Sequence, residues 1–204
     1  MNLLRKLILL GVVASLPLPV FAQGTIVYVD PPDIVIGSNE TSQLIDLNGD
    51  GVDDVRFQRS GGQLTAIPQG NGQLAAESES RAKAIREGEI ISSLGLWQSR
   101  VVDPLLGDFG LLLASDRSFP STGPFAGVDG YLGIRFYIGA NRHYGWIRLD
   151  LDNGFPNQAR GFLTEWAYNS TPNAPLAAGV VPEPSPLALA ALGAGGLLFL
   201  RRLR

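Results

Sequence analysis

The chain contains no cysteine and only one histidine, His143, among its 204 residues. Disulfide bonds, thiolate metal sites and cysteine nucleophiles are therefore excluded. One histidine cannot build a His-rich metal centre, and a Ser-His-Asp triad would depend on it alone. The patterns G-x-S-x-G and H-E-x-x-H are also missing from the sequence. These absences predict a protein that is not an enzyme.

Positive charge is scarce in the central part of the chain. The sequence has 16 Lys and Arg against 19 Asp and Glu, and five of the basic residues but one acidic residue lie near its two ends. Residues 23–179 therefore hold 11 basic and 18 acidic side chains, a net charge of −7. An acidic domain does not attract phosphate backbones, so we expect no nucleic-acid partner. The charge is compatible with divalent cations.

The first 22 residues have the three parts of a secretory signal peptide. Arg5 and Lys6 supply a basic start, and residues 7–16 form an apolar run too short to span a bilayer. Val20 and Ala22 then place small residues at the −3 and −1 positions of a cleavage site. We expect the secretion machinery to export the chain and a signal peptidase to leave a domain over residues 23–179.

Strand-like runs fill most of this domain, and helical patterns are rare. Residues 74–91, rich in Ala, Glu, Lys and Arg, form the one stretch that favours a helix, with Glu79 and Lys83 as an (i, i+4) pair. The expected strands are residues 25–29, 34–36, 43–46, 55–58, 64–67, 94–102, 109–114, 131–138, 144–151 and 161–168. We therefore predict an all-β fold, an antiparallel β-sandwich or jelly-roll-like core with a short helical insertion.

The clearest hairpin joins residues 131–138 to residues 144–151 across a loop at 139–143. In its second arm the side chains alternate, with Trp146 on one face and Ile147 on the other. The same alternation in residues 161–168 predicts three side chains on one face: Phe162, Thr164 and Trp166.

Residues 46–54 form the sharpest local motif of the domain. Oxygen donors fall at positions 1, 3, 5 and 9, Gly51 stands at position 6, and the carbonyl of position 7 completes the set: Asp46, Asn48, Asp50, Asp54 and Val52. This spacing wraps a hard cation such as Ca²⁺, whereas Asp53 is expected to face solvent. The alternative is a plain acidic turn, since Asn-Gly and Asp-Gly are common in hairpins.

The flanks of this loop read as strands, and position 12 is Phe57 instead of the bidentate glutamate of an EF-hand. The loop resembles the short Ca²⁺ hairpin loops of FG-GAP and dockerin-like proteins. That resemblance implies a structural ion that pins a hairpin.

The last 25 residues, 180–204, differ from the domain. A Val-Pro-Glu-Pro motif is followed by an apolar helix over residues 186–200 and a basic tail over residues 201–204. Its defining residues are Val181, Pro182, Glu183, Pro184, Arg201, Arg202 and Arg204. Residues 187–200 would cover only roughly 21 Å as a helix, so they form a marginal transmembrane segment. The arginines keep its end cytoplasmic, which places the domain outside.

This order of motif, apolar helix and arginines resembles the PEP-CTERM sorting signal of Gram-negative bacteria. The resemblance implies an exosortase-type membrane enzyme as partner, transient anchoring in the inner membrane, and delivery to the cell surface or extracellular matrix. It also implies an association with exopolysaccharide.

Three hypotheses for function follow. The first is a non-catalytic envelope or matrix protein stabilised by Ca²⁺. The second is a carbohydrate-binding module for exopolysaccharide, whose candidate stacking residues are Trp97, Tyr144, Trp146 and Trp166. The third and least favoured is an extracellular hydrolase with a pair of carboxylates, for which Glu165 is the best single candidate.

Overall fold

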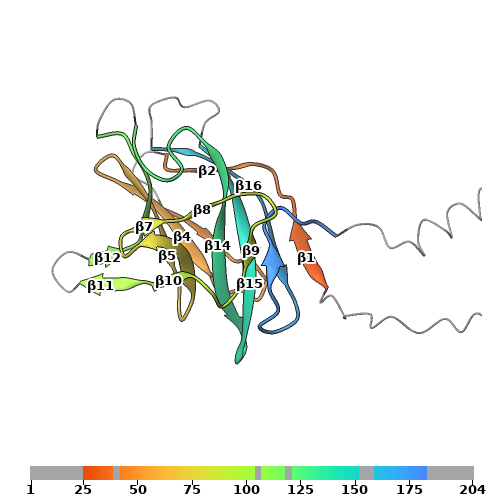
Figure 1. The fold of residues 1–204 in the computed structure, drawn as a ribbon. Coiled ribbons are helices and arrows are strands. Elements are labelled where there is room, and N and C mark those ends of the chain that lie inside the picture. Colours follow the sequence, from red (N-terminus) through yellow and green to blue (C-terminus); the bar gives the residue numbers. More distant parts are fainter. Residues whose placement is uncertain (1–24, 39–41, 104–106, 118–120, 152–158, 183–204) are drawn as a thin grey trace, which may run out of the picture.

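The computed structural model describes residues 25–38, 42–103, 107–117, 121–151 and 159–182. Within these ranges the secondary structure consists of 17 β-strands and no helix, which confirms the predicted all-β class (Figure 1). The strands are β1 (Ile26–Val29), β2 (Ile34–Ile36), β3 (Ser42–Ile45), β4 (Val55–Ser60), β5 (Gln63–Pro68), β6 (Gln73–Ser78), β7 (Arg81–Ala82), β8 (Ala84–Ile85), β9 (Ile90–Ile91), β10 (Leu96–Ser99), β11 (Val101–Asp103), β12 (Gly107–Phe109), β13 (Leu111–Ser115), β14 (Asp129–Ile138), β15 (Asn141–Asp150), β16 (Gly161–Asn169) and β17 (Leu176–Ala177).

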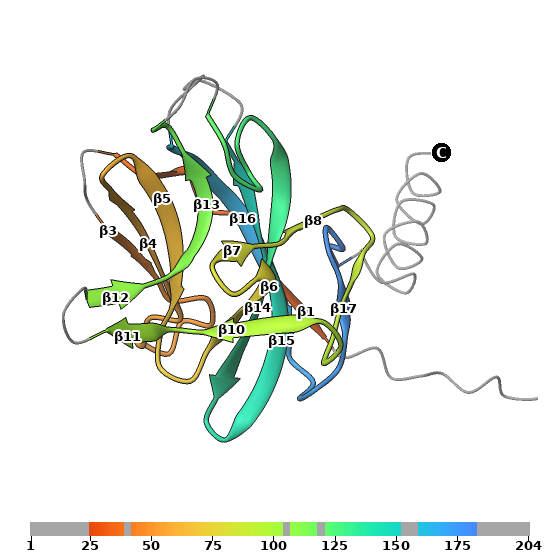
Figure 2. The same cartoon turned by 60° about the vertical axis from the view of Figure 1, so that its left-hand side comes forward.

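Thirteen strands join in one hydrogen-bonded sheet. Its order is β1-β16-β15-β14-β6-β7-β13-β5-β4-β3, and β2, β8 and β10 attach to β16, β14 and β6. The sheet is mixed, because β13 runs parallel to β7 where Leu112 pairs with Arg81. It bends so that β4, β5 and β13 contribute to the same core as β14, β15 and β16 (Figure 2). The result is a sandwich-like fold made from one continuous sheet.

Strand β15 separates two hydrophobic clusters. Ile147 and Leu149 point into the larger cluster, which fills the space between the two halves of the sheet. Tyr144 and Trp146 point to the opposite face and form a smaller cluster with residues of β8, β9 and β17. The alternation predicted for this strand is therefore confirmed, and both of its faces are buried.

The predicted hairpin is also confirmed, with a tighter turn than expected. Strands β14 and β15 pair along their whole length, and the pairing continues to Ile138 and Asn141. Only two residues, Gly139 and Ala140, connect them. Gly139 has a φ of 61°, in the left-handed region that two-residue hairpin turns require.

The helix predicted over residues 74–91 is wrong, because this segment forms β6, β7, β8 and β9. Along β6, Leu74 and Ala76 belong to the larger cluster and Ala75 to the smaller one, so packing covers both faces of the strand. Tertiary packing of this kind overrides a helix propensity of a few tenths of a kcal/mol per residue. Lys83 forms an ion pair with Glu89, in place of the helical (i, i+4) pair that was expected with Glu79.

A β-bulge in β16 changes which side chains face the core. The register against β15 shifts between Arg148 and Leu149, and Thr164 is the extra residue. As a result Leu163 and Trp166, three positions apart, both enter the larger cluster. Phe162, next to Leu163, therefore points to the other face, and the prediction that it shares a face with Trp166 is wrong.

The two predicted targeting segments lie mostly outside the described residues. The predicted signal peptide, residues 1–22, and residues 183–204 of the predicted sorting segment are not among the described residues. Within the described part, no helix has the length and hydropathy needed to cross a bilayer. Ala178 is fully buried after β17, whereas Val180, Val181 and Pro182 have exposed or half-exposed side chains.

Candidate functional site

The calcium-type loop connects β3 to β4, which pair in register from Ser42 with Gln58 to Ile45 with Val55. Its centre is the carboxylate of Asp46. One oxygen of Asp46 accepts the backbone N–H of Gly49 at 2.8 Å, and the other accepts that of Gly51 at 2.8 Å. The chain thus wraps around a negative group at the first position of the motif.

The next two motif positions continue this wrapping. The side-chain oxygen of Asn48 accepts the N–H of Asp50 at 2.8 Å, and a carboxylate oxygen of Asp50 accepts the N–H of Val52 at 2.9 Å. Gly49 and Gly51 have φ angles of 76° and 84°, which side chains rarely adopt. The glycines explain how the loop can turn sharply enough for these short-range hydrogen bonds to form.

Asp54 closes the loop and differs from the other acidic residues because it is buried, with 7% of its surface exposed. Its carboxylate accepts the N–H of Leu47 at 2.9 Å, across the mouth of the loop. The pKa of Asp54 is raised to about 7, mainly because the carboxyl is buried; the bond from Leu47 lowers it, and the nearby charges of Asp46 and Asp50 contribute smaller increases. Removing this negative charge from water is costly unless a cation or a proton accompanies it.

A long-range hydrogen bond attaches the loop to the larger core. The indole N–H of Trp166, on β16, donates to the carbonyl oxygen of Leu47 at 3.0 Å. Leu47 itself is 3% exposed and belongs to the larger cluster. Tyr168 lies on the same strand, and burial raises its pKa, with smaller contributions from the loop carboxylates.

The donor set suits a hard cation. Three carboxylates, one amide oxygen and the Val52 carbonyl offer five or more oxygens, which Ca²⁺ prefers. Across the described residues, no three His, Cys, Asp or Glu side chains are gathered closely enough to form a ready-made metal cage. The fit therefore depends on the loop exchanging some of its internal hydrogen bonds for metal ligation. The Val52 side chain is 64% exposed and takes no part, which leaves its carbonyl as the only contribution.

Three of the four aromatic residues considered for glycan stacking are core residues. Trp146 is 0% exposed, Tyr144 is 1% exposed and Trp166 is 8% exposed. Their rings pack against neighbours and present no open face on which a sugar could stack. The prediction of a stacking platform at these three positions is therefore not compatible with this fold.

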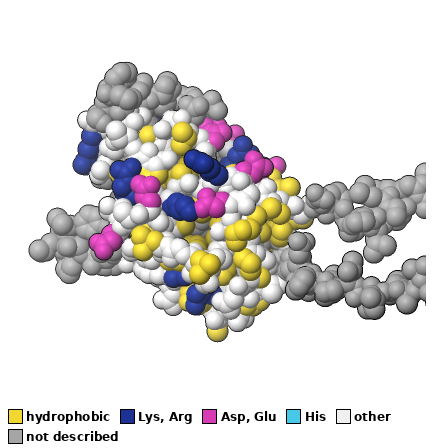
Figure 3. Space-filling model, in the orientation of Figure 1, with side chains coloured by type: hydrophobic (Ala, Val, Ile, Leu, Met, Phe, Trp, Pro, Cys, Tyr) yellow, Lys and Arg dark blue, Asp and Glu magenta, His cyan; other side chains and the backbone are white. Residues whose placement is uncertain are grey.

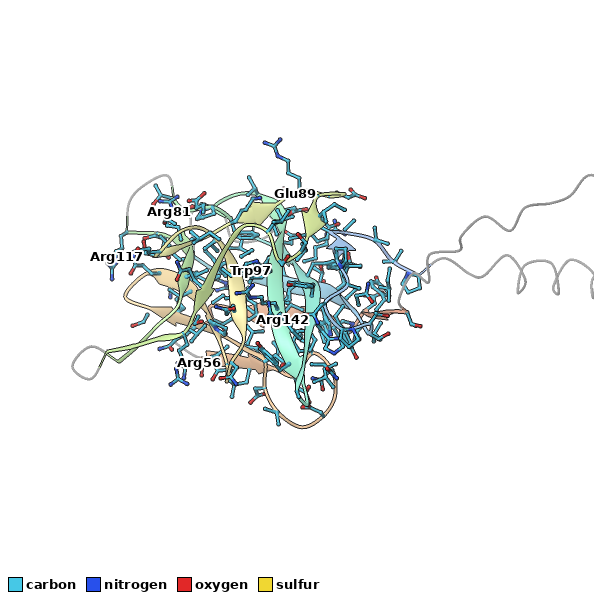
Figure 4. All side chains as sticks on the ribbon, turned by 60° about the horizontal axis from the view of Figure 1, so that its bottom comes forward. Arg56, Arg81, Glu89, Trp97, Arg117 and Arg142 are labelled. Carbon is cyan, nitrogen blue, oxygen red and sulfur yellow. The ribbon has the colours of Figure 1, made fainter. Side chains whose placement is uncertain are left out.

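Trp97 is the exception, since it is only partly buried. It lies against the sheet (Figure 4), its ring 5.8 Å from that of Tyr144, and its indole N–H donates to the carbonyl of Ser92 at 3.1 Å. The guanidinium of Arg135 lies 4.8 Å from its ring centre and covers it. Trp97 thus has both an aromatic partner and a cation against its ring.

The two residues considered for catalysis have structural partners. Glu165 accepts a hydrogen bond from the hydroxyl of Tyr28 and forms an ion pair with Arg148 at 3.1 Å. This bond to a carboxylate raises the pKa of Tyr28 to about 12. His143 is 4% exposed, and its Nδ1 lies 2.8 Å from the carbonyl oxygen of Asn169. Both arrangements hold strands together.

A polar pocket of about 500 Å³ lies on the outer face of the sheet, beside β8 and the start of β14. Two arginines and two carboxylates line it, together with Tyr131. The ring of Tyr131 packs edge-on against that of Trp146, with 5.2 Å between the ring centroids. The guanidinium of Arg148 lies 6.0 Å from the ring of Tyr131. The lining residues are Ala84, Ile85, Arg86, Glu87, Val128, Asp129, Gly130, Tyr131 and Arg148. Sequence reasoning missed this pocket because its parts come from three separate segments.

No protein family, curated protein or solved structure matches this chain.

Proposed function

We propose that the chain is an exported, non-catalytic protein of the cell envelope or extracellular matrix of a Gram-negative bacterium, stabilised by Ca²⁺. Secretion machinery recognises the signal peptide at residues 1–22, and an exosortase-type enzyme processes residues 180–204. Between them, the jelly-roll-like sandwich of residues 23–179 is the part that is delivered. The inner membrane holds the chain only until processing.

The buried carboxylate of Asp54 is the observation that carries the calcium part of the proposal. It lies at the ninth position of a loop whose first, third and fifth positions also present side-chain oxygens. A divalent cation among these groups would offset the cost of burying the Asp54 charge, and the smaller repulsion from Asp46 and Asp50, which together raise its pKa. The protein has no cysteine, so this ion would take the place of a cross-link in holding the β3–β4 hairpin.

Calorimetric titration with CaCl₂ tests this assignment directly. We expect one binding event per chain, and its loss when Asp46 and Asp50 are both replaced by Asn. Asp53→Asn is the matched control, because Asp53 lies in the same loop but outside the ligand set. Equal loss of binding in the control would show that general negative charge, and not this spacing, attracts the ion.

Position and sequence support the sorting part of the proposal. The described chain stays docked up to Ala178 and exposes Val181 and Pro182, the first two motif residues. A membrane enzyme would therefore meet the motif immediately outside the folded domain. Replacing Pro182, Glu183 and Pro184 by Ala should leave an unprocessed, membrane-bound form, whereas Ser185→Ala should be processed normally. Normal release of the triple variant would reject exosortase-type sorting.

The polar pocket favours a second candidate function, binding of exopolysaccharide. Glu87 and Asp129 can accept hydrogen bonds from sugar hydroxyls, and Arg86 and Arg148 can donate to ring and hydroxyl oxygens. The volume of about 500 Å³ accommodates a sugar unit or two. In this reading recognition relies on these charged groups, because three of the four aromatic candidates are buried.

Ligand-observed NMR with purified exopolysaccharide and its monosaccharides tests the second candidate. Saturation transfer to a saccharide should be lost in Asp129→Asn with Glu87→Gln. The control is Glu77→Gln, which changes an exposed carboxylate that is paired with Arg81 on another part of the sheet. Transfer that persists in the pocket variant would show that the sugar binds elsewhere.

A further inference from the structure

An apolar turn lies beside the point where the chain leaves the domain. Residues 90–99 contain no charged side chain. Within this segment Ile90 is 62% exposed, Leu94 is 84% exposed and Leu96 is 45% exposed. Aliphatic side chains exposed singly are ordinary, but three within seven residues concentrate exposed apolar surface on one turn.

The turn is built so that Leu94 stands at its tip. The N–H of Leu94 bonds to the hydroxyl of Ser92, and Gly95 adopts a φ of 110° that reverses the chain before β10. The carbonyl of Ser92 in turn accepts the indole N–H of Trp97. The base of the turn is therefore anchored, while its tip projects an aliphatic side chain into solvent.

The start of the sorting segment lies next to this turn. Ile90 pairs with Ala177 across β9 and β17, and Ala178 donates to the carbonyl of Glu89. Val180 and Val181, 39% and 43% exposed, follow within four residues. In Figure 2 the turn before β10 lies beside β17, and in Figure 3 hydrophobic side chains gather where the described chain ends.

The length of the connection limits where the domain can be. Residue 186, the first of the apolar helix, is eight residues beyond the buried Ala178. Eight residues reach at most about 28 Å when fully extended. While the apolar helix is in the membrane, the turn is therefore held close to the lipid surface at a high effective concentration, so even a weak contact is populated.

We propose that the Ile90–Leu96 turn is a lipid-facing surface that rests on the bilayer while the sorting segment is inserted. Leu94 would enter the boundary between headgroups and acyl chains, with Trp97 and Arg135 at the rim, where such residues are favoured. The inference rests on the proposed insertion of residues 186–200. It adds that the domain takes one orientation, which presents Val181 and Pro182 to a membrane-embedded enzyme.

The absence of cysteine permits a clean experiment with the full chain in phosphatidylcholine vesicles. A bimane label at Leu94→Cys reports depth through quenching by lipids brominated on their acyl chains. The control is Leu44→Cys, since Leu44 is likewise an exposed leucine, at 45% against 84% for Leu94, but lies on β3, across the molecule from β17 (Figure 2). We expect quenching at position 94 several-fold above that at position 44, and a decrease when Ile90 and Leu96 are replaced by Ser.

Three outcomes would overturn the proposal, and flotation of the vesicles distinguishes the first two. If the chain floats with the vesicles but positions 94 and 44 are quenched equally, the sorting segment inserts and the turn does not touch lipid. If the chain does not float, membrane insertion itself fails, and the proposed sorting fails with it. Burial of the label at position 94 that rises with protein concentration without lipid would assign the turn to a contact between two copies, against the proposal.

Discussion

The indole N–H of Trp166 donates to the carbonyl oxygen of Leu47 at 3.0 Å, and the two residues are 119 positions apart in the chain. This bond connects the second residue of the calcium-type loop to the middle of β16. Both residues are buried, so the bond forms where water cannot replace it. The geometry of the loop is consequently coupled to the integrity of the larger core.

Trp166→Phe should weaken the domain and the loop together. The phenyl ring keeps most of the packing, but the Leu47 carbonyl loses its partner, which costs about 1–3 kcal/mol for a buried polar group. We expect a lower unfolding midpoint in urea and a several-fold weaker Ca²⁺ affinity. Trp97→Phe is the control, because it also removes an indole bond, to Ser92, but lies far from the loop in the chain and in the smaller cluster. A loss of Ca²⁺ affinity in both variants would contradict the coupling.

Stability without calcium should fall as the pH rises through the range set by Asp54. The pKa of Asp54 is raised from 3.8 to about 7 in the folded domain, so between these values the folded state holds a proton that the unfolded state has lost. Linkage then makes folding less favourable with increasing pH, by up to a few kcal/mol in total. In EDTA, urea unfolding should show lower stability at pH 7.5 than at pH 5. Excess Ca²⁺ should remove most of that difference.

Asp54→Asn provides the matched control for the pH experiment. Its side-chain oxygen can still accept the Leu47 N–H, but the group no longer titrates. The variant should be less dependent on pH in EDTA than the unmodified domain and should respond weakly to Ca²⁺. An unchanged pH profile would assign the effect to another group.

Tyr28→Phe should loosen the edge of the sheet where β1 pairs with β16. The change removes the hydroxyl that donates to Glu165, and hydrogen bonds to charged groups contribute about 1.5–3 kcal/mol. Hydrogen exchange of the β1 amides should increase accordingly. Tyr137→Phe, at a 38% exposed position, should leave that exchange unchanged. A similar increase in both variants would show that the Glu165 contact is not responsible.

Gly179→Ala should detach the chain just before the sorting motif. Gly179 has a φ of 76°, and an added Cβ would lie 2.8 Å from the hydroxyl of Tyr131 and 3.0 Å from Glu87. Gly127→Ala is the control, since Gly127 has a φ of 66° but open space around its Cβ position. Backbone strain of about 1–2 kcal/mol is common to both, so the difference isolates the contact. Amides of residues 176–180 should exchange faster in Gly179→Ala alone.

The sequence predicted those features that depend on local pattern. The β14–β15 hairpin followed from its alternation, and the strands on either side of the calcium-type loop were expected at nearly their observed positions. The helix prediction for residues 74–91 was wrong because Ala and Glu favour a helix in isolation. The decisive fact is that both faces of β6 are covered by strands far away in the chain.

In the candidate site, too, only the features that depend on local sequence could be predicted. The ligand spacing of the loop was visible in nine consecutive residues, but the burial of Asp54 and its bond to Leu47 depend on how the hairpin docks. Aromatic residues at strand spacing fit a core or a binding face equally well until the covering strands are known. The pocket beside Tyr131 had no local signal, because β8, β14 and β15 each contribute only a part of it.

Thermal unfolding in excess Ca²⁺ and in EDTA tests the central claim most directly. The measurement compares the unmodified domain with the Asp46→Ala, Asp50→Ala double variant. Ca²⁺ at about a hundredfold excess over Kd stabilises the folded state by about 2.7 kcal/mol. For a domain of this size that raises Tm by roughly 5–10 °C. We predict this rise in the unmodified protein, little or none with Mg²⁺, and no rise in the double variant. An equal Tm in Ca²⁺ and EDTA, or an undiminished rise in the double variant, would contradict the assignment of the loop as a calcium site.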